Sequence, residues 1–288
     1  MSTKETDSGL EEVEIELLLE GLHRYYGYDF RQYEPGAVRV RIRESMMAGR
    51  IPTVSRFQEK VLHEPPFLDR FLRAFSGSGL SMFSDAGLYR TFRSRIVPML
   101  KTYPFVRIWY AGCSTGEEVY SLAILLEEEQ IYSRCRIYAT DLSGEAVREA
   151  RKGTFPVTRY EEYESNYGKS GGKGLFADYC KKKGNRMVAD PSLKSQIVFS
   201  EHNLATDGSI NEFQVIVCRN LLDSFNQALK ERVDALIYES LSRFGVLVLG
   251  ATENMRSMPH EGCYATLDEG SGVYQKIVTK VLSRACNR

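Results

Sequence analysis

A glycine-rich turn lies between the most strand-like stretch of the chain and an apolar stretch typical of a helix. Residues 105–111 are rich in β-branched and aromatic side chains and lead into a turn that contains Gly112 and Gly116. A glycine lets the backbone approach a bound group closely, and the N-terminus of the next helix offers free N–H groups. Glu117 and Glu118 occupy that first helical turn, and their charge would repel a phosphate. The pattern predicts a site for a ligand with a cationic end.

An acidic residue ends the next predicted strand. The short apolar run 135–139 is followed by Thr140 and Asp141. In a Rossmann-like unit, an acid at this place hydrogen-bonds ribose hydroxyls. An alternative is that the turn is only a tight connection and that Asp141 caps the helix expected over residues 144–152. The turn and the acid together, at this spacing, favour a nucleoside site.

A third polar group follows the almost wholly apolar run 213–218, which is typical of a central parallel strand covered on both faces. The run ends with Cys218, and Arg219 and Asn220 come directly after it. Ligands of doubly wound folds bind at the carboxyl ends of the strands. We therefore predict that Arg219 and Asn220 are site residues rather than packing residues.

Three motifs carry a resemblance to a known family: Ala-Gly-Cys-Ser-Thr-Gly-Glu-Glu-Val-Tyr-Ser-Leu-Ala (111–123), Ala-Thr-Asp-Leu (139–142) and Val-Cys-Arg-Asn-Leu-Leu (217–222). They resemble the chemotaxis-receptor methyltransferases (CheR), and the likeness extends from about residue 10 to about residue 280. The resemblance implies S-adenosyl-L-methionine (AdoMet) as cofactor, S-adenosyl-L-homocysteine (AdoHcy) as product, and glutamate carboxylates of a chemoreceptor or receptor-like signalling protein as methyl acceptors. It also implies an α/β, Rossmann-like methyltransferase fold with an N-terminal helical domain and a small β-subdomain insert.

The resemblance implies a set of site residues. Arg219 is expected to be the catalytic residue, orienting the carboxylate or the cofactor. Asn203 is expected at the adenine edge, with Leu204 packing on the ring. The cofactor-binding residues are expected to be Gly112, Glu117, Glu118, Asp141, Asn203, Leu204, Cys218, Arg219 and Asn220.

The expected chemistry needs neither a strong base nor a metal. A glutamate carboxylate is already ionised at neutral pH, so catalysis consists of positioning and desolvation. The four histidines (His23, His63, His202 and His260) are dispersed, and the cysteines show no metal-ligand spacing. The sequence therefore favours neither a hydrolytic triad nor a zinc site.

The chain departs from the family pattern at four positions. Relatives carry Asn, Thr and Arg in the cofactor pocket where this chain has Ser78, Leu80 and Ser84, and a tyrosine where it has Ser224. An arginine suits the carboxylate of the cofactor because its planar fork binds two oxygens, which a serine cannot do.

Arg90 or Arg93, on the next predicted helix, is expected to replace the missing arginine. Two alternatives to an active protein methyltransferase stay open. One is a catalytically weak or inactive AdoMet- or AdoHcy-binding regulatory module, and the other is a small-molecule methyltransferase.

Three regions are expected along the chain. Residues 1–9 are polar and predicted to be disordered, residues 10–87 to form the helical domain and its linker, and residues 88–288 to form the AdoMet-binding domain with an insert at about 158–195. The predicted second helix carries Arg39, Arg41, Arg43 and, past a glycine, Arg50. This basic face is either solvated or, as the resemblance implies, in contact with the receptor.

The insert is expected to be the small β-subdomain. Runs 186–189 and 196–199 have the apolar look of its strands, and the parallel sheet resumes at residues 197–200. Its tyrosines, Tyr160, Tyr163, Tyr167 and Tyr179, are expected to form its core. In some relatives the subdomain binds the C-terminal pentapeptide of the receptor, but nothing in this stretch identifies such a ligand.

The composition limits the remaining possibilities. Lys+Arg and Asp+Glu are both 38, so net charge suggests no nucleic-acid partner. No stretch has the length and apolarity of a membrane span, and we expect no direct membrane insertion and a cytoplasmic location. The six cysteines are expected to be reduced and mostly buried.

Overall fold

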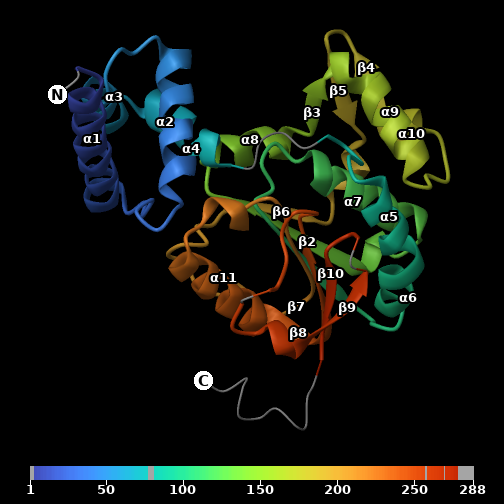
Figure 1. The fold of residues 1–288 in the computed structure, drawn as a ribbon. Coiled ribbons are helices and arrows are strands. Elements are labelled where there is room, and N and C mark those ends of the chain that lie inside the picture. Colours follow the sequence, from blue (N-terminus) through green and yellow to red (C-terminus); the bar gives the residue numbers. More distant parts are fainter. Residues whose placement is uncertain (1–2, 77–80, 257, 269, 278–288) are drawn as a thin grey trace.

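A seven-stranded sheet forms the centre of the computed structural model, which describes residues 3–76, 81–256, 258–268 and 270–277 (Figure 1). The strand order is β6-β2-β1-β7-β8-β10-β9. The first five of these run parallel, whereas β10 is antiparallel to both of its neighbours. The strands are β1 (Val106–Ala111), β2 (Cys135–Asp141), β6 (Ile197–Glu201), β7 (Phe213–Cys218), β8 (Leu241–Leu249), β9 (Tyr264–Asp268) and β10 (Val273–Lys276). This is the expected Rossmann-like methyltransferase sheet.

The two faces of the sheet belong to two separate hydrophobic clusters. Successive side chains of a strand point to opposite faces, so Ile108 and Tyr110 of β1 lie in one cluster and Trp109 and Ala111 in the other. The first cluster includes residues from α5 (Ala86–Thr91), a π-helical turn (Phe92–Ile96), α6 (Val97–Leu100), α7 (Glu117–Glu128) and α8 (Gly144–Lys152). The second includes residues from α11 (Gln227–Ser240) and the N-terminal helices. Helices therefore cover both faces, which leaves the carboxyl ends of the parallel strands as the place for a ligand.

The N-terminal part of the chain is helical. It consists of α1 (Thr3–Tyr26), α2 (Pro35–Gly49), α3 (Val54–His63) and α4 (Pro65–Phe75). Thr53 caps α3 by accepting the Arg56 N–H, and prolines stand at the first helical positions of α2 and α4, where the missing N–H costs nothing. The prediction that residues 1–9 are disordered is wrong from Thr3 onward, because the amphipathic pattern begins at Leu10 but the backbone hydrogen bonding begins earlier.

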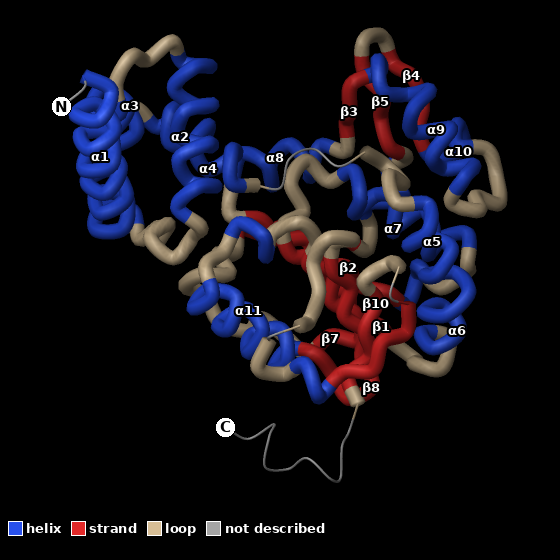
Figure 2. Tube along the Cα trace, in the orientation of Figure 1, coloured by secondary structure: helices blue, strands red, loops and turns tan. Residues whose placement is uncertain are grey.

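The helical domain is bound to the sheet domain by backbone contacts. The N–H of Glu34 donates to the carbonyl of Ser224 at 2.9 Å, and the N–H of Asn226 donates to the carbonyl of Gln32 at 3.0 Å. An ion pair of 3.2 Å joins Arg148 of α8 to Asp69 of α4, and Figure 2 shows these two helices in line. The helical domain therefore contributes side chains directly to the C-terminal edge of the sheet.

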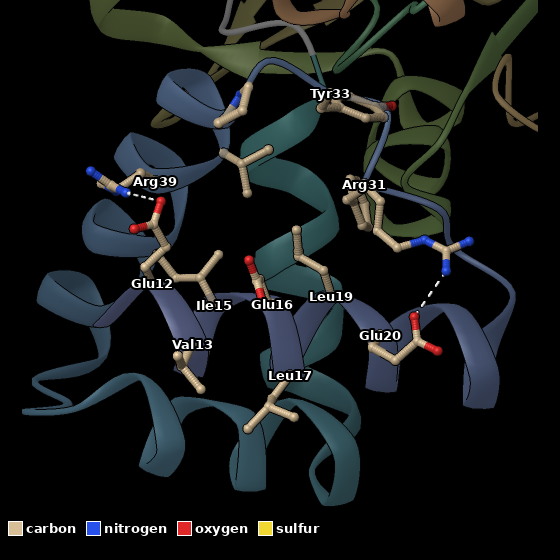
Figure 3. A pocket seen from close by; sticks show the side chains of 13 residues that line it. Glu12, Val13, Ile15, Glu16, Leu17, Leu19, Glu20, Arg31, Tyr33 and Arg39 are labelled. Atoms are coloured by element: carbon tan, nitrogen blue, oxygen red, sulfur yellow. Dashed lines mark hydrogen bonds and ion pairs between the residues drawn. The ribbon is translucent and has the colours of Figure 1, made fainter. Parts of the chain in front are cut away.

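A hollow of about 550 Å³ opens within the helical domain itself, between α1 and the segment 30–39 (Figure 3). Two ion pairs cross it, Arg31 with Glu20 at 2.8 Å and Arg39 with Glu12 at 3.5 Å. None of the predicted cofactor-binding residues lines it. This hollow of the helical domain is therefore not the predicted site.

The insert forms a second, three-stranded sheet in the order β3-β5-β4. Its elements are β3 (Thr154–Pro156), α9 (Tyr160–Lys169), α10 (Phe176–Tyr179), β4 (Cys180–Lys183) and β5 (Arg186–Ala189). The run 186–189 is confirmed as a subdomain strand, whereas the run 196–199 pairs with β2 in the main sheet as β6. The sequence pattern missed β4, since its consecutive lysines hide a strand whose exposed side chains need not be apolar.

Buried aromatic side chains fill the insert as expected. Tyr160, Tyr163 and Tyr167 are buried in the same cluster as α7, whereas Tyr179 is only half-buried against it. Their rings contact Phe155 and Phe176. The interpretation of these tyrosines as a subdomain core is confirmed for the three buried ones.

The cysteines largely follow the sequence-based expectation. Cys113, Cys135, Cys180 and Cys218 are free and buried. The expectation is wrong at Cys263, which is disulfide-bonded, and Cys286 lies outside the described residues. Within the described part of the chain, no helix combines the length and the apolarity needed to cross a membrane.

Candidate functional site

The glycine turn is tied to the ends of two strands. The N–H groups of Gly112 and Cys113 both donate to the carbonyl of Thr140, each at 2.8 Å. Gly112 and Gly116 have φ angles of 75° and 95°, which only glycine adopts without strain, and Gly116 is the residue that precedes α7. A Cβ on Gly112 would lie 2.6 Å from the side chain of Leu221. The turn therefore needs glycine for its backbone angles and for close packing against the loop after β7.

Asp141 is buried at the end of β2, with an exposed fraction of 2%. Its Oδ1 accepts hydrogen bonds from the Ser76 hydroxyl at 2.5 Å and the Ser143 N–H at 2.9 Å, and its Oδ2 accepts the Ser114 N–H at 2.8 Å. Burial raises the pKa of Asp141, and the hydrogen bond from Ser76 opposes that rise. The alternative role as a helix cap is wrong, because the Ser143 side chain caps α8 by accepting the Ala146 N–H.

A small hollow of about 30 Å³ lies beside Asp141, and we call it the aromatic hollow. The rings of Phe75 and Phe225 contact Tyr33 at centroid distances of 5.4 and 5.0 Å. Asn203 lies on its wall with its amide oxygen accepting the Ala205 N–H at 3.0 Å. The lining residues are Tyr33, Phe75, Ser76, Gly112, Thr140, Asp141, Leu142, His202, Asn203, Leu204, Leu221, Ser224 and Phe225.

A second hollow of about 20 Å³ lies on the other side of Gly112, and we call it the acidic hollow. Its lining residues are Tyr110, Gly112, Cys113, Ser114, Glu117, Glu118 and Arg219. Because Gly112 lines both hollows, they are neighbouring parts of one site at the carboxyl edge of the sheet.

The polar groups of the acidic hollow are tightly paired. Arg219, which is 7% exposed, donates from Nη1 to Glu118 Oε1 at 2.5 Å and from Nη2 to Asp85 Oδ2 at 2.9 Å. Glu118 also accepts hydrogen bonds from the hydroxyl of Tyr110 and, at 3.4 Å, from that of Ser84. Burial alone would lower the pKa of Arg219, but Glu118, Tyr110, Tyr89 and Asp85 together outweigh burial and hold the pKa above its usual value. Arg219 is therefore a permanent cation whose charge is neutralised within the protein.

The structure separates the predicted site residues into two groups. Gly112, Glu117, Glu118, Asp141, Asn203, Leu204 and Arg219 line one hollow or both. Cys218 is buried within β7, and Asn220 is exposed with a φ angle of 58°; neither lines the aromatic hollow or the acidic hollow. Glu253 holds the loop around Asn220 by accepting the N–H groups of Asn220 and Leu222 at 2.8 and 2.7 Å.

Arg90 and Arg93 do not replace the missing arginine, so that prediction is wrong. Arg90 donates to the carbonyl of Lys169 at 2.6 Å, and Arg93 pairs with Glu128 and, at 3.0 Å, with Glu129. These partners lie at the interface between α7 and the insert. The carboxylates and the carbonyl at that interface are within hydrogen-bonding distance of the two arginine side chains. Of the other departures from the family pattern, Ser78 and Leu80 lie outside the described residues.

Several residues of the site were not predicted from the sequence. Ser76, Phe75 and Tyr33 come from the helical domain, and Asp85 caps α5 by accepting the Leu88 N–H at 3.0 Å. Arg41 is a further one. It is half-buried, donates to the carbonyl of Ala74 and, at 3.0 Å, to the hydroxyl of Ser224, and lies over the ring of Phe75. The sequence placed Arg41 among the basic residues of α2, but it did not indicate that its partner is Ser224, 183 positions away.

No three or more histidine, cysteine, aspartate or glutamate side chains in the described ranges converge in a way that could hold a metal ion. The charged groups of the site are carboxylates and guanidinium groups, which bind polar organic ligands through hydrogen bonds and charge.

Two family descriptions match the chain. Residues 81–268 match "CheR methyltransferase, SAM binding domain", and residues 13–76 match "CheR methyltransferase, all-alpha domain". The first match contains β1, the glycine turn and α7, and the second coincides with most of α1–α4.

Named relatives of the chain are bacterial proteins. The chain is 37% identical to "Putative methyltransferase Cher3" of Pseudomonas putida, over 92% of this chain and 97% of that protein. It is 28% identical to "Chemotaxis protein methyltransferase" of Listeria innocua, over 85% of this chain and 91% of the relative. It is 30% identical to "Chemotaxis protein methyltransferase 1" of Pseudomonas aeruginosa, over 62% of this chain and 66% of the relative.

Proposed function

The chain belongs to the CheR methyltransferase family, and from this premise we propose that it methylates glutamate side chains of a chemoreceptor or a receptor-like signalling protein. Its cofactor is S-adenosyl-L-methionine. The observation that carries the proposal is the convergence of Asp141, Glu118 and Arg219 around Gly112, at the strand ends where this fold binds ligands.

The donors of the two hollows fit this cofactor. The ribose hydroxyls would bind Asp141, the adenine would lie beside Asn203 and Leu204, and the ammonium group would face Glu117 and Glu118. The hollows of about 30 and 20 Å³ are far smaller than the several hundred Å³ of typical cofactor sites. The site therefore has to widen to admit the cofactor, and a ribose hydroxyl would compete with the Ser76 hydroxyl for Asp141.

Bound AdoMet supplies a sulfonium methyl group, so a glutamate oxygen forms the new C–O bond as the C–S bond breaks and AdoHcy leaves. The protein has to bring an already ionised carboxylate into line with that bond and exclude water. No side chain needs to remove a proton. Arg219 holds Glu118 in place, and through it orients the cofactor.

Arg41 is the group best suited to receive the incoming carboxylate. Its hydrogen bonds go only to the neutral oxygens of Ala74 and Ser224, and no ion pair is found for it among the described residues. Burial lowers the pKa of Arg41, so its charge gains from a carboxylate partner. Because Ser224 lines the aromatic hollow, a glutamate bound by Arg41 arrives beside the cofactor.

The test is transfer of a radiolabelled methyl group from AdoMet to receptor-containing membranes, followed by alkaline release of the label as methanol, which identifies a carboxyl ester. We expect alkali-labile incorporation that stops when glutamates of the acceptor are replaced by alanine. Label that resists alkali would contradict O-methylation.

A regulatory module that binds AdoMet or AdoHcy is the second candidate, and it is favoured by Ser84 and Ser224, which stand where relatives carry an arginine and a tyrosine. Tight cofactor binding without methyl transfer to any receptor preparation would support this candidate.

A further inference from the structure

The acidic hollow has more carboxylates than cations. Glu117 and Glu118 line it, Asp85 reaches its rim, and Arg219 is the one basic residue among its lining side chains. Asp85 is half-buried, whereas Glu117, Glu118 and Arg219 are buried, so water screens these last three charges only weakly. The hollow therefore carries a surplus of negative charge.

Arg219 has no free fork for another carboxylate. Nη1 and Nη2 are held by two different side chains, Glu118 at 2.5 Å and Asp85 at 2.9 Å, and Nε is buried without a partner. A third carboxylate could bind only by displacing one of the two. It would also come close to the remaining carboxylates, which repel it.

No other described arginine lines the hollow, and Arg159, whose charge interacts with that of Glu117, pairs with Glu162. Arg90 and Arg93 are bonded to Lys169, Glu128 and Glu129, and Ser84 presents a hydroxyl to Glu118 at 3.4 Å. Among the described residues, the hollow thus offers carboxylate oxygens to a ligand cation and no comparable group to a ligand anion.

We infer that the acidic hollow recognises the cofactor by its positive charges and not by its carboxylate, so that the ligand class is an adenosyl sulfonium with an aminoalkyl chain. This inference rests on the proposed AdoMet site. At neutral pH the sulfonium, ammonium and carboxylate give AdoMet one net positive charge. AdoHcy has lost the sulfonium and is neutral, whereas decarboxylated AdoMet carries two positive charges.

The test measures the dissociation constants of AdoMet, AdoHcy and decarboxylated AdoMet by calorimetry on the full chain. We expect decarboxylated AdoMet to bind at least as tightly as AdoMet, and AdoHcy to bind about tenfold more weakly than AdoMet, because a single charge a few ångströms from partly buried carboxylates is worth this much or more. AdoHcy binding as tightly as AdoMet, or decarboxylated AdoMet binding more weakly than AdoMet, overturns the inference.

Asp85→Asn tests the cause. Asparagine keeps the capping oxygen for the Leu88 N–H but frees Nη2 of Arg219. We expect AdoMet and AdoHcy to bind about fivefold more tightly, and decarboxylated AdoMet to gain nothing. Asp178→Asn is the matched control, since it makes the same charge change on the exposed face of α10. Equal gains for all three ligands, or no gain for any, contradict the mechanism.

Methyl transfer, measured in parallel, separates this inference from the proposed function. Transfer together with the reverse order of affinities overturns only the inference. If none of the three ligands binds, both are overturned.

Discussion

Two guanidinium groups reach the same site from different domains, and they are paired in opposite ways. Arg219 follows a central strand, is buried, and bonds to the carboxylates of Glu118 and Asp85. Arg41 lies on α2 of the helical domain, is half-buried, and bonds only to the neutral oxygens of Ala74 and Ser224. Arg219 lines the acidic hollow, and Arg41 contacts Ser224 and Phe75, which line the aromatic hollow.

The difference shows that the position of an arginine does not define its role. A guanidinium between two carboxylates is already more than neutralised, so it has little attraction left for a further anion. A guanidinium bonded to neutral oxygens keeps most of its attraction for an anion. We therefore assign the architecture of the cofactor site to Arg219 and capture of the acceptor carboxylate to Arg41.

The largest expected effect comes from Arg41→Gln. Glutamine can still donate a hydrogen bond but lacks the charge and the fork, so we expect the rate of methyl transfer to fall about 100-fold while cofactor affinity stays unchanged. Radiolabel incorporation and calorimetry measure the two quantities. Arg39→Gln is the control, because Arg39 is on the same helix but pairs with Glu12 at the surface at 3.5 Å. Equal losses of methyl-transfer rate in both variants would show that the basic face of α2 acts in receptor docking and that Arg41 has no specific role in binding the acceptor carboxylate.

Asp141→Ala tests the other end of the site. Loss of hydrogen bonds between a charged group and the ribose should weaken AdoHcy binding by about 1.5 to 3 kcal/mol. Asp190→Ala is a matched control, because Asp190 likewise accepts a backbone N–H, from Ser192 at 3.0 Å, but lines neither hollow. Unchanged AdoHcy affinity in Asp141→Ala would refute the ribose assignment.

Ser84→Arg would give the acidic hollow a second cation. Since Ser84 lies 3.4 Å from Glu118, the new guanidinium could share that carboxylate and leave Arg219 freer to bind the cofactor. We expect AdoMet to bind about five- to tenfold more tightly, most clearly at low salt. Ser94→Arg adds the same charge at an exposed position of the adjoining π-helical turn. Weaker binding in Ser84→Arg alone would mean that the hollow has no room for another cation.

The smallest effect is expected for Ser76→Ala. It removes the hydroxyl that occupies Asp141, so a ribose no longer has to displace it, and AdoHcy should bind about threefold more tightly. Calorimetry would show this gain, and Ser195→Ala, an exposed serine, should show none. A loss of affinity would indicate that Ser76 stays in contact with the bound nucleoside.

Local sequence patterns were sufficient where one strand or turn carries the information. The apolar runs around residues 105–111 and 213–218 became β1 and β7, and Gly112, Asp141 and Arg219 lie at the strand ends as expected. Sequence patterns failed where pairing with a neighbouring strand determines the structure. β4 is a strand because β5 pairs with it, and the run 196–199 joins the main sheet because β2 offers its edge.

The sequence by itself determined the strand, turn and helix around Gly112 and the strand that ends at Asp141, and with them the predicted place of a nucleoside site after β1 and β2. Only the tertiary structure decided how the charges pair. Arg93 binds Glu128 across 35 positions of the chain, Arg219 binds Asp85 across 134, and Arg41 reaches Ser224 across 183. Long charged side chains take whichever partner the fold brings within about 3 Å, and no local periodicity encodes that choice.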